Sequence, residues 1–296
     1  MPGLVLNGTY TALVTPFKKD LTIDFDKVKE LIDFQIENGI DGIVICGSTG
    51  ESATMSTKEK IALIVLAVEH ARGRTQIIAG TGSNDTAATI DLSLIAKEAG
   101  ADALLLVCPY YNKPTQEGLY YHYKQIADAV DIPQILYNVP GRSGVNMQAE
   151  VQLKLAKDCP NIIATKEASG NMDQVMEIIN KRPKDFYVLS GEDSLTIPLI
   201  AMGADGVIGV IPNYAPKQFS EAVSHALKGN IKTAARMHYK LFDLIQMNFI
   251  ESNPIPVKAA LAIMGKIEEN YRSPMFPIHQ DNRKKLEKAL RKAKII

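Results

Sequence analysis

Lys166 is the residue of this sequence with the clearest capacity for covalent chemistry. It closes an apolar run at 162–166, which is typical of a buried strand. Burial favours the neutral form of an amine, and a neutral amine can condense with a ketone to form a Schiff base. An ion pair with the adjacent Glu167, or extension of the side chain into solvent, is the structural alternative.

Two more reactive side chains lie at the end of an apolar run at 134–137 and in the loop after it. Tyr137 ends this run, and a phenol beside an amine or its iminium form could transfer protons. Arg142 lies in the next loop, at 141–144 (GRSG), where its guanidinium could bind a carboxylate bidentately. A packed tyrosine with a satisfied hydroxyl and a solvated arginine are the alternatives at these positions.

A third set of polar groups follows the run at 42–46. The loop at 47–52 (GSTGES) offers the hydroxyls of Ser48 and Thr49 and backbone N–H groups freed by glycine, which together could bind a small anion. The loop lacks the GxxxxGK[ST] spacing of a nucleotide-binding loop. An ordinary turn with Ser and Thr caps is the alternative.

The predicted strands and helices that must position these groups alternate regularly along the chain. Continuous apolar runs, typical of strands buried on both faces, occupy 10–15, 42–46, 76–80, 103–107, 134–137, 162–166, 187–190 and 206–209. Stretches with helical spacing lie between them, at 24–38, 57–72, 86–99, 116–129 and 172–181 among others.

Eight such units predict a closed (β/α)₈ barrel at 1–228, with a doubly wound open sheet as the alternative. Residues 229–296 are expected to form a C-terminal helical extension, interrupted by prolines at 253–256. Catalytic groups of a barrel gather at the carboxyl ends of its strands, where Lys166, Tyr137 and Ser48 are predicted to lie.

Charge balance, residue positions and missing motifs argue against several other classes of function. The 33 basic and 33 acidic side chains of the 296 residues cancel, so nothing favours binding to nucleic acid or an anionic membrane. The histidines lie outside the predicted strand ends, and no GxGxxG follows a strand, so neither a metal nor a dinucleotide is expected. Three scattered cysteines and the absence of a signal peptide predict reduced thiols in a cytoplasmic protein.

Five motifs together resemble the dihydrodipicolinate synthase family. They are GSTGES (47–52), PYYNKP (109–114), YNVPGRSG (137–144), KEASGN (166–171) and NPIPVK (253–258). The resemblance extends from residue 8 to about residue 290. It implies a (β/α)₈ lyase that condenses pyruvate with L-aspartate 4-semialdehyde, the first committed step of diaminopimelate and lysine biosynthesis. It also implies a homotetramer, as a dimer of dimers, without a separate cofactor.

The resemblance also assigns catalytic roles. Lys166 would form the Schiff base with pyruvate, and Tyr137 would donate and accept protons. Ser48 and Tyr111 would complete a proton relay, with Tyr111 reaching in from a neighbouring subunit. The family usually has threonine where this chain has Ser48, which keeps the hydroxyl but loses the methyl that restricts its rotamer. We expect activity to be retained.

Substrate contacts follow from the same resemblance. Thr49 would bind the carboxylate of pyruvate, and the backbone of Ile208 would lie against the pyruvyl group with Gly191 nearby. Arg142 would hold the carboxylate of the aldehyde substrate.

Many family members are inhibited by L-lysine in a pocket between subunits. The matching positions here are Ser52, Ala53, Asn84 and Tyr110. The pocket's usual histidine and glutamate are replaced by Lys60 and Ala88, which disfavours a cationic ligand. The sequence therefore predicts weak or absent inhibition by lysine.

Other functions stay open at this point. The chain could be another pyruvate-dependent aldolase or lyase, of the N-acetylneuraminate lyase or 2-keto-3-deoxygluconate aldolase type, or a deoxyglucarate dehydratase. Arg142 favours a short carboxylated aldehyde over a sugar. A non-catalytic pyruvate-binding homologue is a further alternative, against which the presence of both Lys166 and Tyr137 argues.

Overall fold

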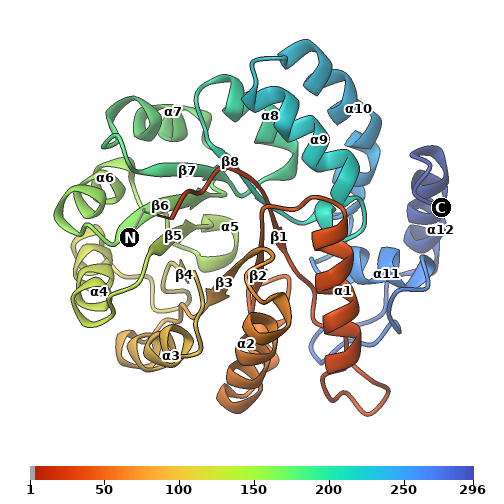
Figure 1. The fold of residues 1–296 in the computed structure, drawn as a ribbon, viewed down its shortest axis with the longest axis horizontal. Helices are drawn as coiled ribbons and strands as arrows, with labels where there is room; N and C mark the ends of the chain where they lie inside the picture. The colour runs from red at the N-terminus through yellow and green to blue at the C-terminus, as the bar shows by residue number, and fades with distance from the viewer. Residues whose placement is uncertain (1–3) are drawn as a thin grey trace.

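Eight parallel strands close into a barrel in a computed structural model that describes residues 4–296 (Figure 1). Each strand pairs with its neighbours in chain order, and β8 pairs with β1. The strands are β1 (Gly8–Ala12), β2 (Gly42–Ile45), β3 (Gln76–Gly80), β4 (Ala103–Val107), β5 (Gln134–Asn138), β6 (Ile162–Glu167), β7 (Tyr187–Ser190) and β8 (Gly206–Gly209). The closed barrel predicted from the sequence is confirmed, and the open sheet is wrong.

The first strand differs from its predicted range of 10–15. Gly8 and Thr9 belong to β1 because they pair with Gly206 and Val207 of β8. The strand ends at Ala12: the N–H of Leu13 still donates to the backbone oxygen of Val44 in β2, but the N–H of Val14 donates to the side-chain Oδ1 of Asn213 at 3.0 Å. Hydrophobicity alone extended the prediction, since residues 13 and 14 are apolar and buried without being part of the strand.

Helices surround the barrel and cover the outer faces of its strands (Figure 1). They are α1 (Phe25–Glu37), α2 (Thr57–Ala71), α3 (Thr86–Glu98), α4 (Gln116–Ala129), α6 (Ala149–Asp158), α7 (Met172–Lys181), α8 (Thr196–Ala201) and α9 (Pro216–Leu227). Ser56 and Glu59 form a capping box at the start of α2. Gly39 and Gly100 follow α1 and α3 with φ of 77° and 89°, a conformation that favours glycine.

Three further helices form the C-terminal extension: α10 (Ile231–Met247), α11 (Ile255–Ile263) and α12 (Gln280–Lys292). Helix α10 packs against α9, and α12 packs against α10 and α11 (Figure 1). The predicted boundary after residue 228 falls in the short turn between α9 and α10. One hydrophobic cluster includes both Val188 of the barrel and Leu244, Val257 and Leu286 of the extension, so the core is continuous across that turn.

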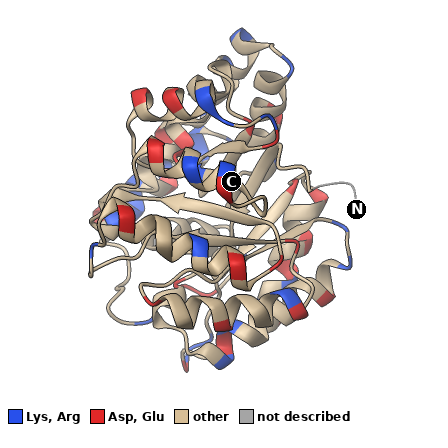
Figure 2. Cartoon of the chain, turned by 90° about the vertical axis from the view of Figure 1, so that its left-hand side faces the viewer, with Lys and Arg blue, Asp and Glu red and all other residues tan. Residues whose placement is uncertain are grey.

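Ribbon positions of basic and acidic residues are interspersed along the elements in Figure 2. Within residues 4–296 no helix is long and apolar enough to cross a membrane. The same residues contain no cluster of three His, Cys, Asp or Glu side chains suited to a metal ion. All three cysteines, Cys46, Cys108 and Cys159, are buried free thiols.

Candidate active site

Lys166 lies at the carboxyl end of β6 and points into the mouth of the barrel. It pairs in register with Tyr137 of β5 on one side and Leu189 of β7 on the other. Residues in register on parallel strands project in the same direction, so the lysine and the tyrosine side chains meet. The Lys166 Nζ lies 4.2 Å from the centre of the Tyr137 ring, and the lysine is only 5% exposed.

This position makes Lys166 a better nucleophile than an ordinary lysine. Burial lowers the pKa of its amine to about 8, although the carboxylates of Asp193 and Glu192 act in the opposite direction. At pH 8 about half of the amine is therefore neutral, against about 0.3% for an unperturbed lysine. The gain in reactive amine is about 150-fold.

The phenol of Tyr137 stays protonated at neutral pH. Burial raises the pKa of this phenol to about 12, while Arg142 and the Ser48 hydroxyl partly offset the rise. A phenol that is protonated at neutral pH and lies against a nucleophilic amine can donate a proton to a departing hydroxyl.

A small cavity above Lys166 joins residues from separate strands and from the C-terminal extension. Its lining includes most of the site residues predicted from the sequence: Lys166, Tyr137, Ser48, Thr49, Arg142 and Gly191. It also includes Glu192, Val210, Phe249 and Asn253. The structure thus places one amine, one phenol, two hydroxyls and one guanidinium around a single space large enough only for a small molecule.

Asn253, from the extension, connects the two predicted carboxylate anchors. Its Nδ2 donates to Thr49 Oγ1 at 2.9 Å, and its backbone oxygen accepts from the Arg142 guanidinium at 3.3 Å. Because the oxygen of Thr49 already accepts a hydrogen bond, its own proton is free to be donated into the cavity. The Oδ1 of Asn253 is buried and finds no hydrogen-bond partner within residues 4–296.

Two predicted site residues lie outside this cavity lining. Tyr111 is 89% exposed and has φ of 72°, so its side chain stands away from the barrel of its own chain. Ile208 is fully buried in β8 among the side chains that fill the barrel, two residues before the cavity-lining Val210.

The positions predicted for a lysine pocket lie in two places. Ser52 and Ala53 form part of the 3₁₀ turn η1 (Ser52–Thr54), which follows the loop of Ser48. Asn84 donates through Nδ2 to the backbone oxygen of Tyr110 at 3.2 Å, so these two residues are in direct contact. Tyr110 is 40% exposed.

Glu192 and Asp193, two acidic residues in the loop after β7, were not predicted as functional groups from the sequence. Asp193 is buried, and burial raises its pKa to about 6 even though it accepts from the N–H groups of Val210 and Ile211. A Cβ at Gly209 would lie 2.3 Å from its Oδ1, so this carboxylate requires glycine there. Two successive acids after a buried strand were the available signal.

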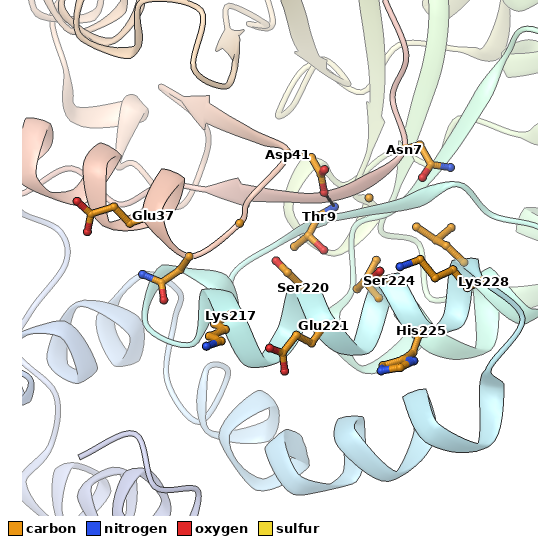
Figure 3. A pocket seen from close by; sticks show the side chains of 15 residues that line it. Asn7, Thr9, Glu37, Asp41, Lys217, Ser220, Glu221, Ser224, His225 and Lys228 are labelled. Carbon is orange, nitrogen blue, oxygen red and sulfur yellow. Dashed lines mark hydrogen bonds between the residues drawn. The ribbon is translucent and has the colours of Figure 1, made fainter.

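A larger groove, of about 980 Å³, lies along α9 near the start of β1 (Figure 3). Thr9 and Ser220 face each other across it, and Asp41 accepts from the N–H of Thr9 at 2.8 Å. This groove contains none of the groups around Lys166. It adjoins the amino-terminal ends of the strands, whereas barrel enzymes carry their chemistry at the carboxyl ends. The smaller cavity is therefore the candidate active site.

Comparisons with known proteins agree with this geometry. Residues 5–293 match the Dihydrodipicolinate synthetase family. The 4-hydroxy-tetrahydrodipicolinate synthase of Koribacter versatilis is 50% identical over 98% of this chain and 97% of its own length, and that of Chloroherpeton thalassium is 49% identical over 96% and 94%.

The chain belongs to the dihydrodipicolinate synthetase family.

Solved structures of dihydrodipicolinate synthases superpose along nearly the whole chain. The enzyme from Aquifex aeolicus is 45% identical, with a TM-score of 0.96 over 98% of this chain and 99% of its own. A chloride-inhibited enzyme from Acinetobacter baumannii, in complex with pyruvate, is 43% identical, with a TM-score of 0.97 over 99% and 100%. The family resemblance predicted from the five motifs is confirmed.

Proposed function

We propose that this chain is a 4-hydroxy-tetrahydrodipicolinate synthase that condenses pyruvate with L-aspartate 4-semialdehyde through a Schiff base on Lys166. The observation that carries the proposal is the buried amine of Lys166, with a pKa of about 8, held against the ring of Tyr137 at the mouth of the barrel. Full-length relatives of that name support the choice of substrates over the sugar aldehydes of other pyruvate aldolases.

The first half of the reaction would join pyruvate to the enzyme. The neutral Lys166 amine attacks the ketone carbon, the resulting hydroxyl takes a proton from Tyr137, and water leaves to give an iminium. Loss of a proton from the methyl carbon then gives a nucleophilic enamine. The carboxylate of pyruvate would accept from the Thr49 hydroxyl, whose proton is free because Asn253 occupies its oxygen.

The second half would form the carbon–carbon bond. The enamine carbon attacks the aldehyde carbon of the semialdehyde, and the new alkoxide takes a proton through Tyr137 and Ser48. The amino group of the adduct then attacks the carbon bound to Lys166, which closes the ring and releases the lysine. Arg142, at the edge of the cavity, would hold the carboxylate of the semialdehyde.

The working unit would be a homotetramer built as a dimer of dimers. A tyrosine that is 89% exposed beside the barrel mouth supports the proposal that Tyr111 enters the site of a neighbouring subunit and completes the relay with Ser48. The proposed reaction uses no cofactor, because the Schiff base forms with the substrate pyruvate itself. Buried free thiols are consistent with a reducing compartment, and we propose the cytoplasm.

Competing aldehydes test the proposed substrate. The purified chain is given pyruvate with L-aspartate 4-semialdehyde, N-acetylmannosamine or glyceraldehyde, and consumption of pyruvate is measured. We expect kcat/KM to be at least 100-fold higher with the semialdehyde. Faster turnover of either sugar aldehyde would overturn the proposal and indicate another member of the superfamily.

A further inference from the structure

A buried ion pair connects the C-terminal extension to the loop that carries Ser48 and Thr49. The Nζ of Lys258, in α11, lies 2.6 Å from Oε1 of Glu51. The side chains are 0% and 2% exposed, respectively. Glu51 directly follows the glycine-rich turn at 47–50, so its position is coupled to the two hydroxyls of the candidate site.

Both oxygens of the Glu51 carboxylate are bound by the extension. Oε1 accepts from Lys258, and Oε2 accepts from the backbone N–H of Arg272 at 3.3 Å. The ammonium of Lys258 lies over two aromatic rings, 4.3 Å from the centre of Phe17 and 5.2 Å from that of Tyr271. The extension therefore holds this carboxylate in one place without help from solvent.

The backbone at Glu51 supports the same conclusion. Its φ is 56°, a left-handed conformation that a glutamate adopts at an energetic cost unless surrounding contacts hold it. The turn is also tightly packed, because a Cβ at Gly50 would lie 3.1 Å from the backbone oxygen of Leu13. A small displacement of Glu51 would consequently move Ser48 and Thr49 instead of being absorbed by the turn.

Stability alone does not explain this pair. Two charges removed from water lose their solvation, and an apolar pair of similar size is commonly as stable or more stable. An ion pair does something an apolar pair does not, because it fixes the direction and distance of the groups that it joins.

We propose that Lys258 and Glu51 are positioning residues for the reaction. Their ion pair holds the turn at 47–51 so that the Ser48 and Thr49 hydroxyls stand at the correct distance from Lys166 for pyruvate. The inference deepens the proposed function and rests on it. It also makes the extension an integral part of the active site, since both groups that bind the Glu51 carboxylate come from the extension.

The test compares Glu51→Gln and Lys258→Met with the unchanged full-length protein. For each protein, the fraction of chains that pyruvate and borohydride can label is first measured on a separate sample. KM for each substrate and kcat are then measured on unlabelled protein, and kcat is divided by that fraction. We expect KM for pyruvate to rise at least tenfold in both variants, with KM for the aldehyde within threefold of the parent. Glu51→Gln keeps the size of the side chain, so it decides the question if Lys258→Met fails to fold.

Lys266→Met is the matched control. Lys266 also lies in the extension and over an aromatic ring, 3.6 Å from the centre of Phe34, but it is outside the ion pair. We expect this variant to keep both KM values within twofold. A purely structural role for Glu51 and Lys258 would instead reduce the labelled fraction and leave KM for pyruvate unchanged, which would overturn the inference. Absence of labelling in the parent would contradict the proposed function itself.

Discussion

The pKa of Lys166 can be measured through the pH dependence of pyruvate capture. Burial lowers that pKa to about 8, so the neutral fraction is about 1% at pH 6 and about 50% at pH 8. We expect kcat/KM for pyruvate to rise about tenfold per pH unit at low pH and to level off above pH 8, because this constant reports ionisations of the free enzyme. A rise that continues to pH 10 would refute the assignment.

The variant Asp193→Asn tests whether a nearby carboxylate contributes to the pKa of Lys166. The Asp193 carboxylate has a pKa of about 6, so it is ionised at pH 8, where it stabilises the ammonium form of Lys166 and raises its pKa. Removing that charge should lower the pKa of the amine and move the rising limb about one pH unit lower. Asparagine can still accept from the N–H groups of Val210 and Ile211, which preserves the loop. An unchanged limb, or one at higher pH, would contradict the electrostatic account.

Three further predictions concern the binding groups. Ser48→Ala should lower kcat about 100-fold in a steady-state assay, whereas Ser48→Thr should keep nearly full activity. Turnover of the alanine variant near the parent rate would show that this hydroxyl is outside the relay. Arg142→Ala should raise KM for the aldehyde about 10- to 150-fold, as loss of about 1.5–3 kcal/mol from a charged hydrogen bond implies, while borohydride labelling by pyruvate stays unchanged. Weaker labelling with an unaltered KM for the aldehyde would reverse the assignment. L-Lysine should inhibit weakly or not at all because Lys60 and Ala88 replace the usual pocket residues, and inhibition at micromolar lysine would prove that inference wrong.

The barrel was predictable because its strands are buried on both faces and appear in the sequence as separate apolar runs. The carboxyl ends of these runs then predicted that Lys166, Tyr137 and Ser48 lie close together. The error at β1 has the same origin, since residues 13 and 14 are apolar and buried although the strand ends at Ala12.

The extension's contribution could not be predicted in the same way. Asn253 and Thr49 are separated by about 200 positions in the chain, and no local periodicity reports that their side chains meet at 2.9 Å. The Lys258–Glu51 pair could not be predicted for a related reason. Charged residues usually lie at the surface, and no local sequence pattern distinguishes the rare buried ones. Asp193 was not predicted as a functional residue because the sequence alone does not show that its carboxylate is buried.

Covalent trapping tests the central claim most directly. The protein is incubated with pyruvate, reduced with borohydride and digested, and the modified peptide is identified by mass spectrometry, with Lys166→Ala as the control. Our account predicts one reduced pyruvyl group per chain, on Lys166, and no labelling of the variant. Labelling of another lysine, or equal labelling of Lys166→Ala, would contradict it.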